Sequence, residues 1–359
     1  MKKVTVLITC VGALDSPSQV GSLRDNPDHR LIRIVGVDGR NDCIGKYICD
    51  AFYKVPFGGD KNYAKIILGI CEKEKVNVVF PASHEEALPL AKAKKMFENK
   101  GIKIAISDYD VLESAFNKIT SYEILAKNNL PYPKFFVVKS ADEFQAAAKK
   151  LGYPKKDIVM KQALGRGGRG VRILTKANPL TIIFDEKPGS IYFNYNNALE
   201  GMKALPKFPE VVLTEYLPGM YYSVDFLAMN GEPLIIVPKI RIDGNPSTTL
   251  LGLVKKNSLV EKTVANICRV FKFSYNINIE IKFSDDGVPI PYDINPRIAA
   301  SVAFCSAAGA NLIYYGLKLA LGEKIPEKVE ITEGVKMVRY LKEYYTKEDI
   351  KRSTGGARK

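Results

Sequence analysis

Tryptophan is absent from this chain of 359 residues, and histidine occurs only as His29 and His84. The six cysteines include no Cys-x-x-Cys pair. With two imidazoles and no paired thiols, the sequence argues against a structural zinc site and against a disulfide framework. No Ser–His or Cys–His set typical of nucleophilic catalysis is recognisable either. We therefore expect a protein of the reducing cytoplasm without a protein nucleophile.

Long apolar runs are also missing, since no stretch approaches the roughly 20 residues that a membrane-spanning helix needs. The apolar segment at residues 4–11 is too short for a signal sequence, so we expect it to be a first buried strand. It is not followed by the Gly-x-Gly-x-x-Gly fingerprint, which disfavours dinucleotide binding. We expect no contact with a membrane.

Negative charge is in deficit, and the formal net charge is +14. Such a charge attracts anions, which include nucleic acid, ATP and acidic small molecules. The charge alone does not choose among them. The length suits two or three packed subdomains, and residues 346–359 read as a basic tail.

Short β-branched runs at 4–11, 31–37, 76–80 and 102–106 alternate with helical or loop segments. This rhythm predicts an α/β fold that begins with parallel β/α units. Further along the chain we expect two long helices, at 109–128 and around 299–321. The same patterns predict further strands at 134–139, 158–161, 171–174, 211–217, 221–229 and 233–241.

A hairpin with one polar face is predicted over residues 277–294. Apolar and polar residues alternate on both arms, and Asp286-Gly287 favours a two-residue type I′ turn. That turn places Glu280 opposite Asp293. Two facing carboxylates repel unless a cation lies between them, and oxygen ligands favour Mg²⁺, with Mn²⁺ as the alternative. A solvated hairpin with a wet acidic side is the competing interpretation.

The strand continues with a further polar pattern. Asp293, Asn295 and Arg297 recur at every second position, so a carboxylate, an amide and a guanidinium share one face. A metal-bound phosphate requires such a set. We therefore predict Glu280, Asp293 and Asn295 as metal ligands.

A glycine-rich loop lies between the predicted strands at 158–161 and 171–174. It contains Gly165, Arg166, Gly167, Gly168 and Gly170. Free backbone amides in such a loop can close on phosphate oxygens. A floppy surface loop and an Arg-Gly-Gly contact to RNA are the alternatives.

These motifs together resemble the ATP-grasp superfamily, and most closely its carbamoyl-phosphate-synthase-like branch of carboxylate–amine ligases. The resemblance rests on Lys118, on Lys161 with the glycine-rich loop, on the Thr-Glu-Tyr-Leu-Pro-Gly segment at 214–219 and on the hairpin. It implies an N-terminal parallel β/α domain at 1–112. A two-lobed ATP-grasp domain would follow, with its small lobe at 113–210 and its large lobe at 211–345.

The resemblance also implies roles for single residues. Lys118 and Lys161 would contact phosphate or adenine under the glycine-rich lid, and the backbone around Glu215, Tyr216 and Leu217 would read the adenine edge. Tyr221 stands where the family usually has a ribose-binding glutamate.

Lys239 and Arg241 share one face of a predicted strand. With Arg297 they would bind a substrate carboxylate or the transferring phosphoryl group. For Lys239 and Arg241, an edge-strand solubility device is the alternative.

The implied activity is an ATP- and Mg²⁺-dependent ligase that activates a carboxylate as an acyl phosphate and couples it to an amine. Its partners would be small-molecule acids and amines rather than nucleic acid, and a homodimer is a possible assembly. A basic nucleic-acid-binding protein and an ATP-dependent phosphotransferase that stops before ligation are the other candidates.

Overall fold

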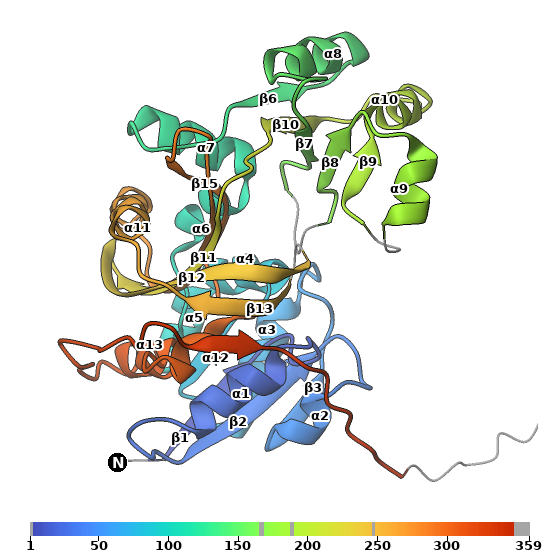
Figure 1. Ribbon diagram of the computed structural model, residues 1–359. Helices are drawn as coiled ribbons and strands as arrows, with labels where there is room; N and C mark the ends of the chain where they lie inside the picture. The colour runs from blue at the N-terminus through green and yellow to red at the C-terminus, as the bar shows by residue number, and fades with distance from the viewer. Residues whose placement is uncertain (1–2, 165–168, 187–189, 246–247, 348–359) are drawn as a thin grey trace, which may run out of the picture.

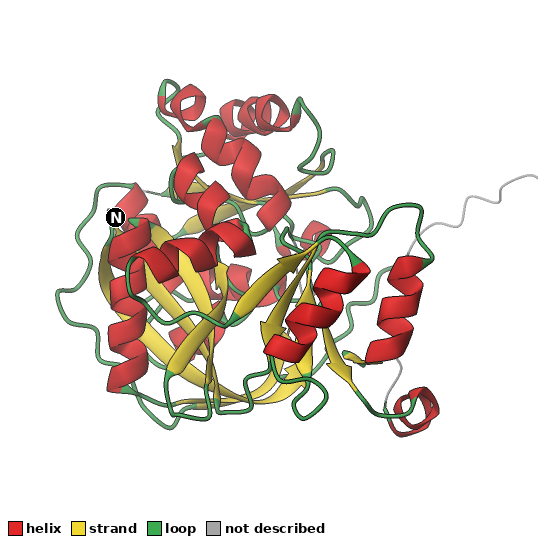
Figure 2. Cartoon of the chain, turned by 90° about the horizontal axis from the view of Figure 1, so that it is seen from above, coloured by secondary structure: helices red, strands yellow, loops and turns green. Residues whose placement is uncertain are grey.

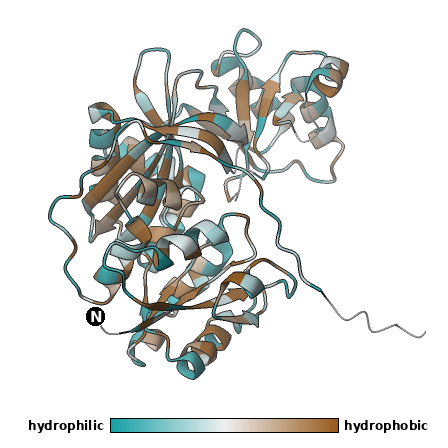
Figure 3. Cartoon of the chain, turned by 60° about the horizontal axis from the view of Figure 1, so that its bottom comes forward, coloured by the Kyte–Doolittle hydropathy of each residue, from teal (hydrophilic) through white to brown (hydrophobic). Residues whose placement is uncertain are grey.

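The structure is a computed structural model, which describes residues 3–164, 169–186, 190–245 and 248–347. It contains three sheets, stacked from the N-terminal unit at the bottom of Figure 1 to a small upper lobe. Helices flank the sheets in the view from above (Figure 2). Brown, apolar colour concentrates on the strands in Figure 3, as expected for sheets that are covered by helices.

The N-terminal sheet has the strand order β3-β2-β1-β4-β5, and every pairing is parallel. Its strands are β1 (Val4–Ile8), β2 (Ile32–Asp38), β3 (Ala51–Lys54), β4 (Val78–Phe80) and β5 (Lys103–Ile104). Its helices are α1 (Ser16–Arg24), α2 (Gly45–Ile48), α3 (Tyr63–Glu74), α4 (His84–Lys92) and α5 (Lys94–Glu98). Each parallel crossover carries a helix, which confirms the predicted β/α units. The edge strand β3 was not predicted, because its four residues show no apolar alternation.

The second sheet has the order β6-β10-β7-β8-β9. Its elements are β6 (Phe135–Val138), α8 (Ala141–Lys150), β7 (Ile158–Lys161), β8 (Arg172–Thr175), α9 (Pro179–Asp185), β9 (Tyr192–Asn194), α10 (Tyr195–Lys203) and β10 (Val211–Glu215). Strand β10 pairs with β6 and β7. We therefore propose that the small lobe extends beyond the predicted boundary at 210/211 and ends after Glu215.

The third sheet has the order β15-β14-β11-β12-β13-β16. Its elements are β11 (Tyr221–Met229), β12 (Glu232–Asn245), β13 (Thr248–Val254), α11 (Ser258–Phe271), β14 (Tyr275–Phe283), β15 (Pro289–Asn295), α12 (Val302–Ala307), α13 (Leu312–Ala320) and β16 (Lys336–Val338). All of its pairings are antiparallel.

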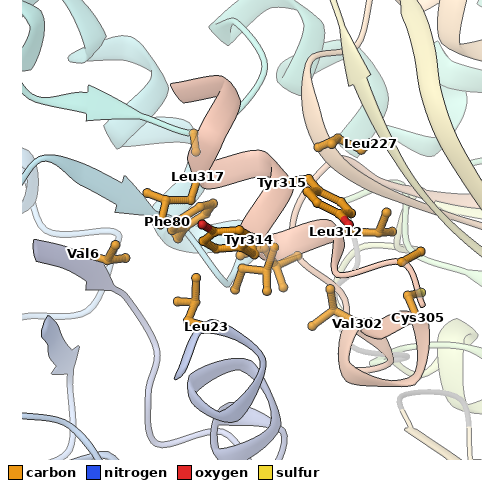
Figure 4. Close-up of a cluster of buried hydrophobic side chains, with 14 of the residues drawn as sticks. Val6, Leu23, Phe80, Leu227, Val302, Cys305, Leu312, Tyr314, Tyr315 and Leu317 are labelled. Carbon is orange, nitrogen blue, oxygen red and sulfur yellow. The ribbon is translucent and has the colours of Figure 1, made fainter. Parts of the chain in front are cut away.

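Helix α13 joins the N-terminal sheet to the third sheet in one hydrophobic core. In Figure 4, Tyr314 and Leu317 lie toward Phe80, while Tyr315 lies toward Leu227. The ion pair between Arg30 and Glu323 adds a polar link between the same two units. These two units therefore form one platform below the small lobe.

Both long helices that the sequence predicted are interrupted. The first divides into α6 (Tyr109–Phe116) and α7 (Lys118–Lys127), because Asn117 is extended and its side chain caps α7 by accepting from Ile119 and Thr120. The second divides into α12 and α13, where Gly309 adopts a positive φ and Asn311 caps α13. The first interruption places Lys118 at the start of a helix.

The predicted register of the hairpin is confirmed at its functional end, since Glu280 pairs with Asp293. The predicted turn is wrong. Only Gly287 has a positive φ there, so a type I′ turn is excluded, and the amide of Ser284 donates to the carbonyl of Val288 across a three-residue loop. A bulge at Tyr292 restores the register, because the pairing shifts by one residue between Glu280 and Ile281.

Candidate active site

A pocket of about 350 Å³ lies between the second and third sheets. Its walls come from β7, β8 and β10 on one side, from β11, β12, β14 and β15 on the other, and from the first residue of α7. Small-molecule sites have volumes of about 300–1,000 Å³. The predicted residues that line it are Lys118, Lys161, Glu215, Tyr216, Leu217, Tyr221, Arg241, Asp293 and Asn295. The fold thus brings together residues up to about half the chain apart.

The segment between the two sheets forms one end of the pocket. Glu215 ends β10, and its carboxylate accepts from the amide of Lys134 at 2.8 Å. The carbonyl of Leu217 accepts from the ammonium of Lys282 at 3.3 Å. Gly219 then approaches the third sheet so closely that its amide donates to the carbonyl of Phe283. This connecting segment is therefore fixed to both lobes.

An ion pair forms another part of the pocket wall. The ammonium of Lys118 lies 2.7 Å from one carboxylate oxygen of Asp293, and the amide of Asn295 donates to the other at 3.0 Å. Burial by itself raises the pKa of Asp293, but the charge and hydrogen bond of Lys118 outweigh it and hold that pKa below its ordinary value. Asp293 is therefore an anion held between donors.

Lys161 also lines the pocket, and its side chain is buried near Lys118. Its ammonium donates to the hydroxyl of Tyr122 at 3.2 Å and lies 5.1 Å from the ring centre of Tyr292. Burial and the nearby charge of Lys118 lower its pKa from 10.5 to about 7. An anionic ligand would stabilise the charged form of this ammonium, which burial and the neighbouring lysine destabilise.

Glu280 on β14 pairs with Asp293 on β15, and only one of its two carboxylate oxygens accepts a hydrogen bond from the described residues. Its Oε1 accepts from the hydroxyl of Ser223 at 3.1 Å and lies 3.8 Å from the guanidinium of Arg241. Its Oε2 is buried and has no hydrogen-bond partner among the described residues. Burial raises the pKa of Glu280, and Arg241 opposes that rise. An orphaned buried carboxylate oxygen is unfavourable unless a cation or donor satisfies it.

The donors around Glu280 and Asp293 fit a hard divalent cation. Two carboxylates and the amide of Asn295 offer oxygen ligands, which Mg²⁺ prefers. The described residues contain no cluster of three or more His, Cys, Asp or Glu side chains that could hold a metal alone.

The structure separates Lys239 from the pocket. Its ammonium lies 2.5 Å from Asp225 and donates to Cys305, and the two charged side chains are only 2% and 4% exposed. The predicted contact of Lys239 with substrate is therefore wrong for this structure, because a buried counter-ion occupies the ammonium. Arg241 does line the pocket, with its guanidinium 4.3 Å from the ring centre of Tyr221.

Two other predictions stay open. Arg297 follows the end of β15, donates to the carbonyl of Ile298 at 2.8 Å and is not among the pocket-lining residues, so its contact with phosphate stays a prediction. Residues 165–168 lie outside the described residues, and so do the predicted contacts of Gly165, Arg166, Gly167 and Gly168. Gly170 is described, with a positive φ.

Several pocket residues were not predicted. Lys282 lies two residues after Glu280 on the same face, and the period-2 pattern could have identified it. Its ammonium lies 5.3 Å from the ring centre of Tyr216. Tyr292 reaches the pocket through the β-bulge, which no sequence signal announced. The segment Ile242–Gly244 follows Arg241 on β12, beyond the predicted end of that strand.

Three protein families match successive parts of the chain. Residues 19–105 match the PylC-like N-terminal domain. Residues 117–190 match the ATP-binding domain of the carbamoyl-phosphate synthase L chain. Residues 207–343 match the family described as ATP-grasp in the biosynthetic pathway with Ter operon.

Curated relatives are distant. The carbamoyl phosphate synthase large chain of Archaeoglobus fulgidus is 25% identical over 274 residues, which cover 73% of this chain and 23% of that protein. The uncharacterized protein y4rH of Sinorhizobium fredii is 25% identical over 228 residues, which cover 60% of this chain and 44% of that protein. The chain thus spans less than half the length of either relative.

Solved structures share the fold. N5-carboxyaminoimidazole synthetase from Staphylococcus aureus, complexed with ADP, superposes with a TM-score of 0.68 at 17% identity, covering 94% of this chain and 82% of the other. The biotin carboxylase domain dimer of Hydrogenobacter thermophilus 2-oxoglutarate carboxylase, in complex with MgADP and bicarbonate, has a TM-score of 0.65 at 18% identity, with coverage of 92% and 73%. The likeness confirms the predicted fold class.

Proposed function

We propose that this chain, which is an ATP-grasp protein with a carbamoyl-phosphate-synthase-like ATP-binding domain and a PylC-like N-terminal domain, is an ATP- and Mg²⁺-dependent carboxylate–amine ligase. It would activate a carboxylate as an acyl phosphate, join the acyl group to an amine and release ADP and phosphate. One observation carries the proposal. The pocket between the two sheets is lined by Lys118, Lys161 and the carboxylate of Asp293, and Glu280 pairs with Asp293 on the neighbouring strand.

The pocket suits a nucleoside triphosphate along its length. Backbone groups of the connecting segment 214–217 would receive the adenine edge, and β-branched side chains such as Val159 and Ile173 line the adjoining wall. Lys118 and Lys161 would take the phosphates at the other end. Tyr221 also lines the pocket and would face the ribose in place of an acidic residue.

Glu280, Asp293 and Asn295 would hold Mg²⁺ together with phosphate oxygens. When bound, the ion neutralises charge on the phosphates during transfer. Lys118 is paired with Asp293 in this structure, so ATP binding would move the ammonium to phosphate and leave Asp293 to the cation. This exchange of partners would keep each charge compensated.

The chemistry follows from the weakness of a carboxylate as an electrophile. A carboxylate oxygen would attack the γ-phosphorus of ATP as the bond to ADP breaks, which converts an oxide leaving group into phosphate. The amine would then attack the acyl carbon, expel phosphate and lose a proton. Arg241 lines the pocket and would orient the carboxylate or the transferring phosphoryl group. Positioning and charge compensation supply this catalysis without a protein nucleophile.

Other features complete the proposal. A homodimer is a candidate assembly, because one of the structural neighbours is described as a dimer. The six cysteines are free thiols, which suits a reducing cytoplasm. Among the described residues, no helix combines the length and the apolar character needed to cross a bilayer.

The decisive test is a screen of acids and amines for ADP release, followed by mass analysis of the product. Before the screen, ATP with Mg²⁺ should raise the thermal midpoint, since a ligand at a hundredfold excess over its Kd stabilises by about 2.7 kcal/mol. Unrelated single-stranded RNA should not. Tight, salt-sensitive RNA binding without an ATP response would refute the proposal in favour of a nucleic-acid-binding role. A phosphorylated acid without an amide product would identify a phosphotransferase.

A further inference from the structure

A buried chain of hydrogen bonds lies on the face of the third sheet that carries Glu280. Strands β11 and β14 pair so that Ser223 lies opposite Glu280 and Asp225 lies opposite Asn278. Strand β12 adds Lys239 opposite Ser223. These side chains form one polar layer directly beside the proposed metal ligand.

The charged end of this chain is the pair between Lys239 and Asp225. The carboxylate of Asp225 accepts from the ammonium of Lys239 at 2.5 Å, from the amide of Asn278 at 2.7 Å and from the hydroxyl of Ser301 at 2.9 Å. Removing one partner of so buried a pair would leave an uncompensated charge. The carboxylate of Asp225 is therefore a fixed hydrogen-bond acceptor, and it orients the amide of Asn278 with its nitrogen toward Asp225.

The direction of the remaining bonds follows from the donors available. The same nitrogen of Asn278 donates to the hydroxyl oxygen of Ser223 at 3.0 Å. Because that oxygen already accepts, the single hydroxyl proton of Ser223 is left to donate to Oε1 of Glu280, which lies 3.1 Å away. Oε2 of Glu280 is the atom without a partner among the described residues. This chain of hydrogen bonds thus satisfies Oε1 of Glu280 and leaves Oε2 without a hydrogen bond from the described residues.

We infer that Ser223 and Asn278, anchored by the Asp225–Lys239 pair, are positioning residues that orient the carboxylate of Glu280 so that Oε2 is presented to a divalent cation. The inference rests on the proposed function, since it concerns the same site. It assigns Lys239 to the support of the metal ligand instead of to the substrate. Groups that hold metal ligands in place typically change metal affinity by about 10–100-fold when they are removed.

The test compares Ser223→Ala with Ser306→Ala. Both remove one hydroxyl from a side chain that is buried or partly buried, but Ser306 donates to Ser22 at the junction with the N-terminal unit. The readout is the Mg²⁺ concentration that half-saturates the thermal shift given by a fixed ATP concentration. Mn²⁺ binding followed by electron paramagnetic resonance provides a second measurement that does not depend on turnover.

Ser223→Ala should raise the required metal concentration about 10-fold or more, whereas Ser306→Ala should leave it unchanged. Asn278→Ala keeps the hydroxyl of Ser223 but frees its direction, so a smaller rise is expected. Circular dichroism without ligand checks that each variant is folded, and Asn278→Ala replaces Ser223→Ala if the latter is not.

Two failures are distinguishable. If wild-type protein binds ATP with Mg²⁺ and Ser223→Ala and Asn278→Ala have its metal requirement, the positioning role is refuted while the proposed function stands. If wild-type protein shows no metal-dependent nucleotide binding, both the proposed function and this inference are overturned.

Discussion

Replacement of Asp293 by Asn tests the electrostatics of the site without any ligand. The change keeps the size of the side chain and an oxygen that can accept from Lys118, but it removes the negative charge. Lys118 and Lys161 would then lie near each other without the anion that both contact or approach. We expect Asp293→Asn to destabilise the unliganded protein.

The sign depends on which of two charges dominates. Considered from the hairpin alone, Glu280 faces Asp293, and the loss of one carboxylate would relieve a repulsion. The structure adds Lys118 at 2.7 Å from Asp293. The charge and hydrogen bond of Lys118 hold the pKa of Asp293 below its ordinary value, so the attraction outweighs the repulsion from Glu280. Arg241 compensates Glu280 further.

The size of the effect follows from burial. The side chains of Lys118 and Asp293 are 12% and 31% exposed. Breaking an exposed pair costs about 0–1 kcal/mol, and breaking a fully buried one costs about 3–5 kcal/mol. We therefore expect a loss of about 2 kcal/mol in the free energy of unfolding, between those two limits, measured by urea titration at neutral pH.

A matched control lies on the same hairpin. Asp285 pairs with Lys156 at 2.6 Å, but the side chains of Lys156 and Asp285 are 62% and 58% exposed. Asp285→Asn should change the stability by less than about 1 kcal/mol. A variant Asp293→Asn that is as stable as wild type, or more stable, would refute the ion-pair argument. Turnover should fall as well, because a proposed metal ligand is lost.

Three further predictions concern neighbouring parts of the site. Relative to Lys161→Met, wild-type protein should gain stability as pH rises from about 7 toward 10.5, because the lowered pKa of Lys161 makes its charged form costly below that window; parallel stability curves for the two proteins would contradict this. Lys282→Met should raise the KM for ATP about fivefold through loss of one hydrogen bond to the connecting segment, with kcat little changed, and steady-state kinetics with an unaltered KM would exclude a role in that segment. Gly219→Ala should destabilise the protein by about 1–3 kcal/mol, because the added Cβ would lie 2.5 Å from the carbonyl oxygen of Phe283. In the control Gly201→Ala in α10, the added Cβ meets nothing within 4 Å, so this variant should be more stable than wild type by about 0.5–1 kcal/mol. Equal unfolding midpoints of the two variants would refute the close approach of Gly219 to Phe283.

Local periodicity was enough to predict the two arms of the hairpin, because successive strand residues face opposite sides of the sheet. The pairing of Glu280 with Asp293 was predicted from a two-residue turn, and it is present although that turn is not. The β/α rhythm predicted the parallel N-terminal sheet, because parallel strands need a crossover connection between them. The hairpin turn was predicted wrongly, and Glu280 still pairs with Asp293 because the bulge at Tyr292 compensates for the extra residue in the loop.

Which charged side chains meet depends on packing in three dimensions. Lys239 and Arg241 share a strand face, but Lys239 meets Asp225 and Arg241 reaches the pocket, because neighbouring strands supply different partners along the same face. The break at Asn117 sets Lys118 against Asp293, although 175 residues separate them by number. Charge pairing depends on distance in space, which a one-dimensional pattern does not contain. The polarity of each strand face could therefore be predicted from the sequence, whereas the partner of each charged side chain depended on how the strands and helices pack.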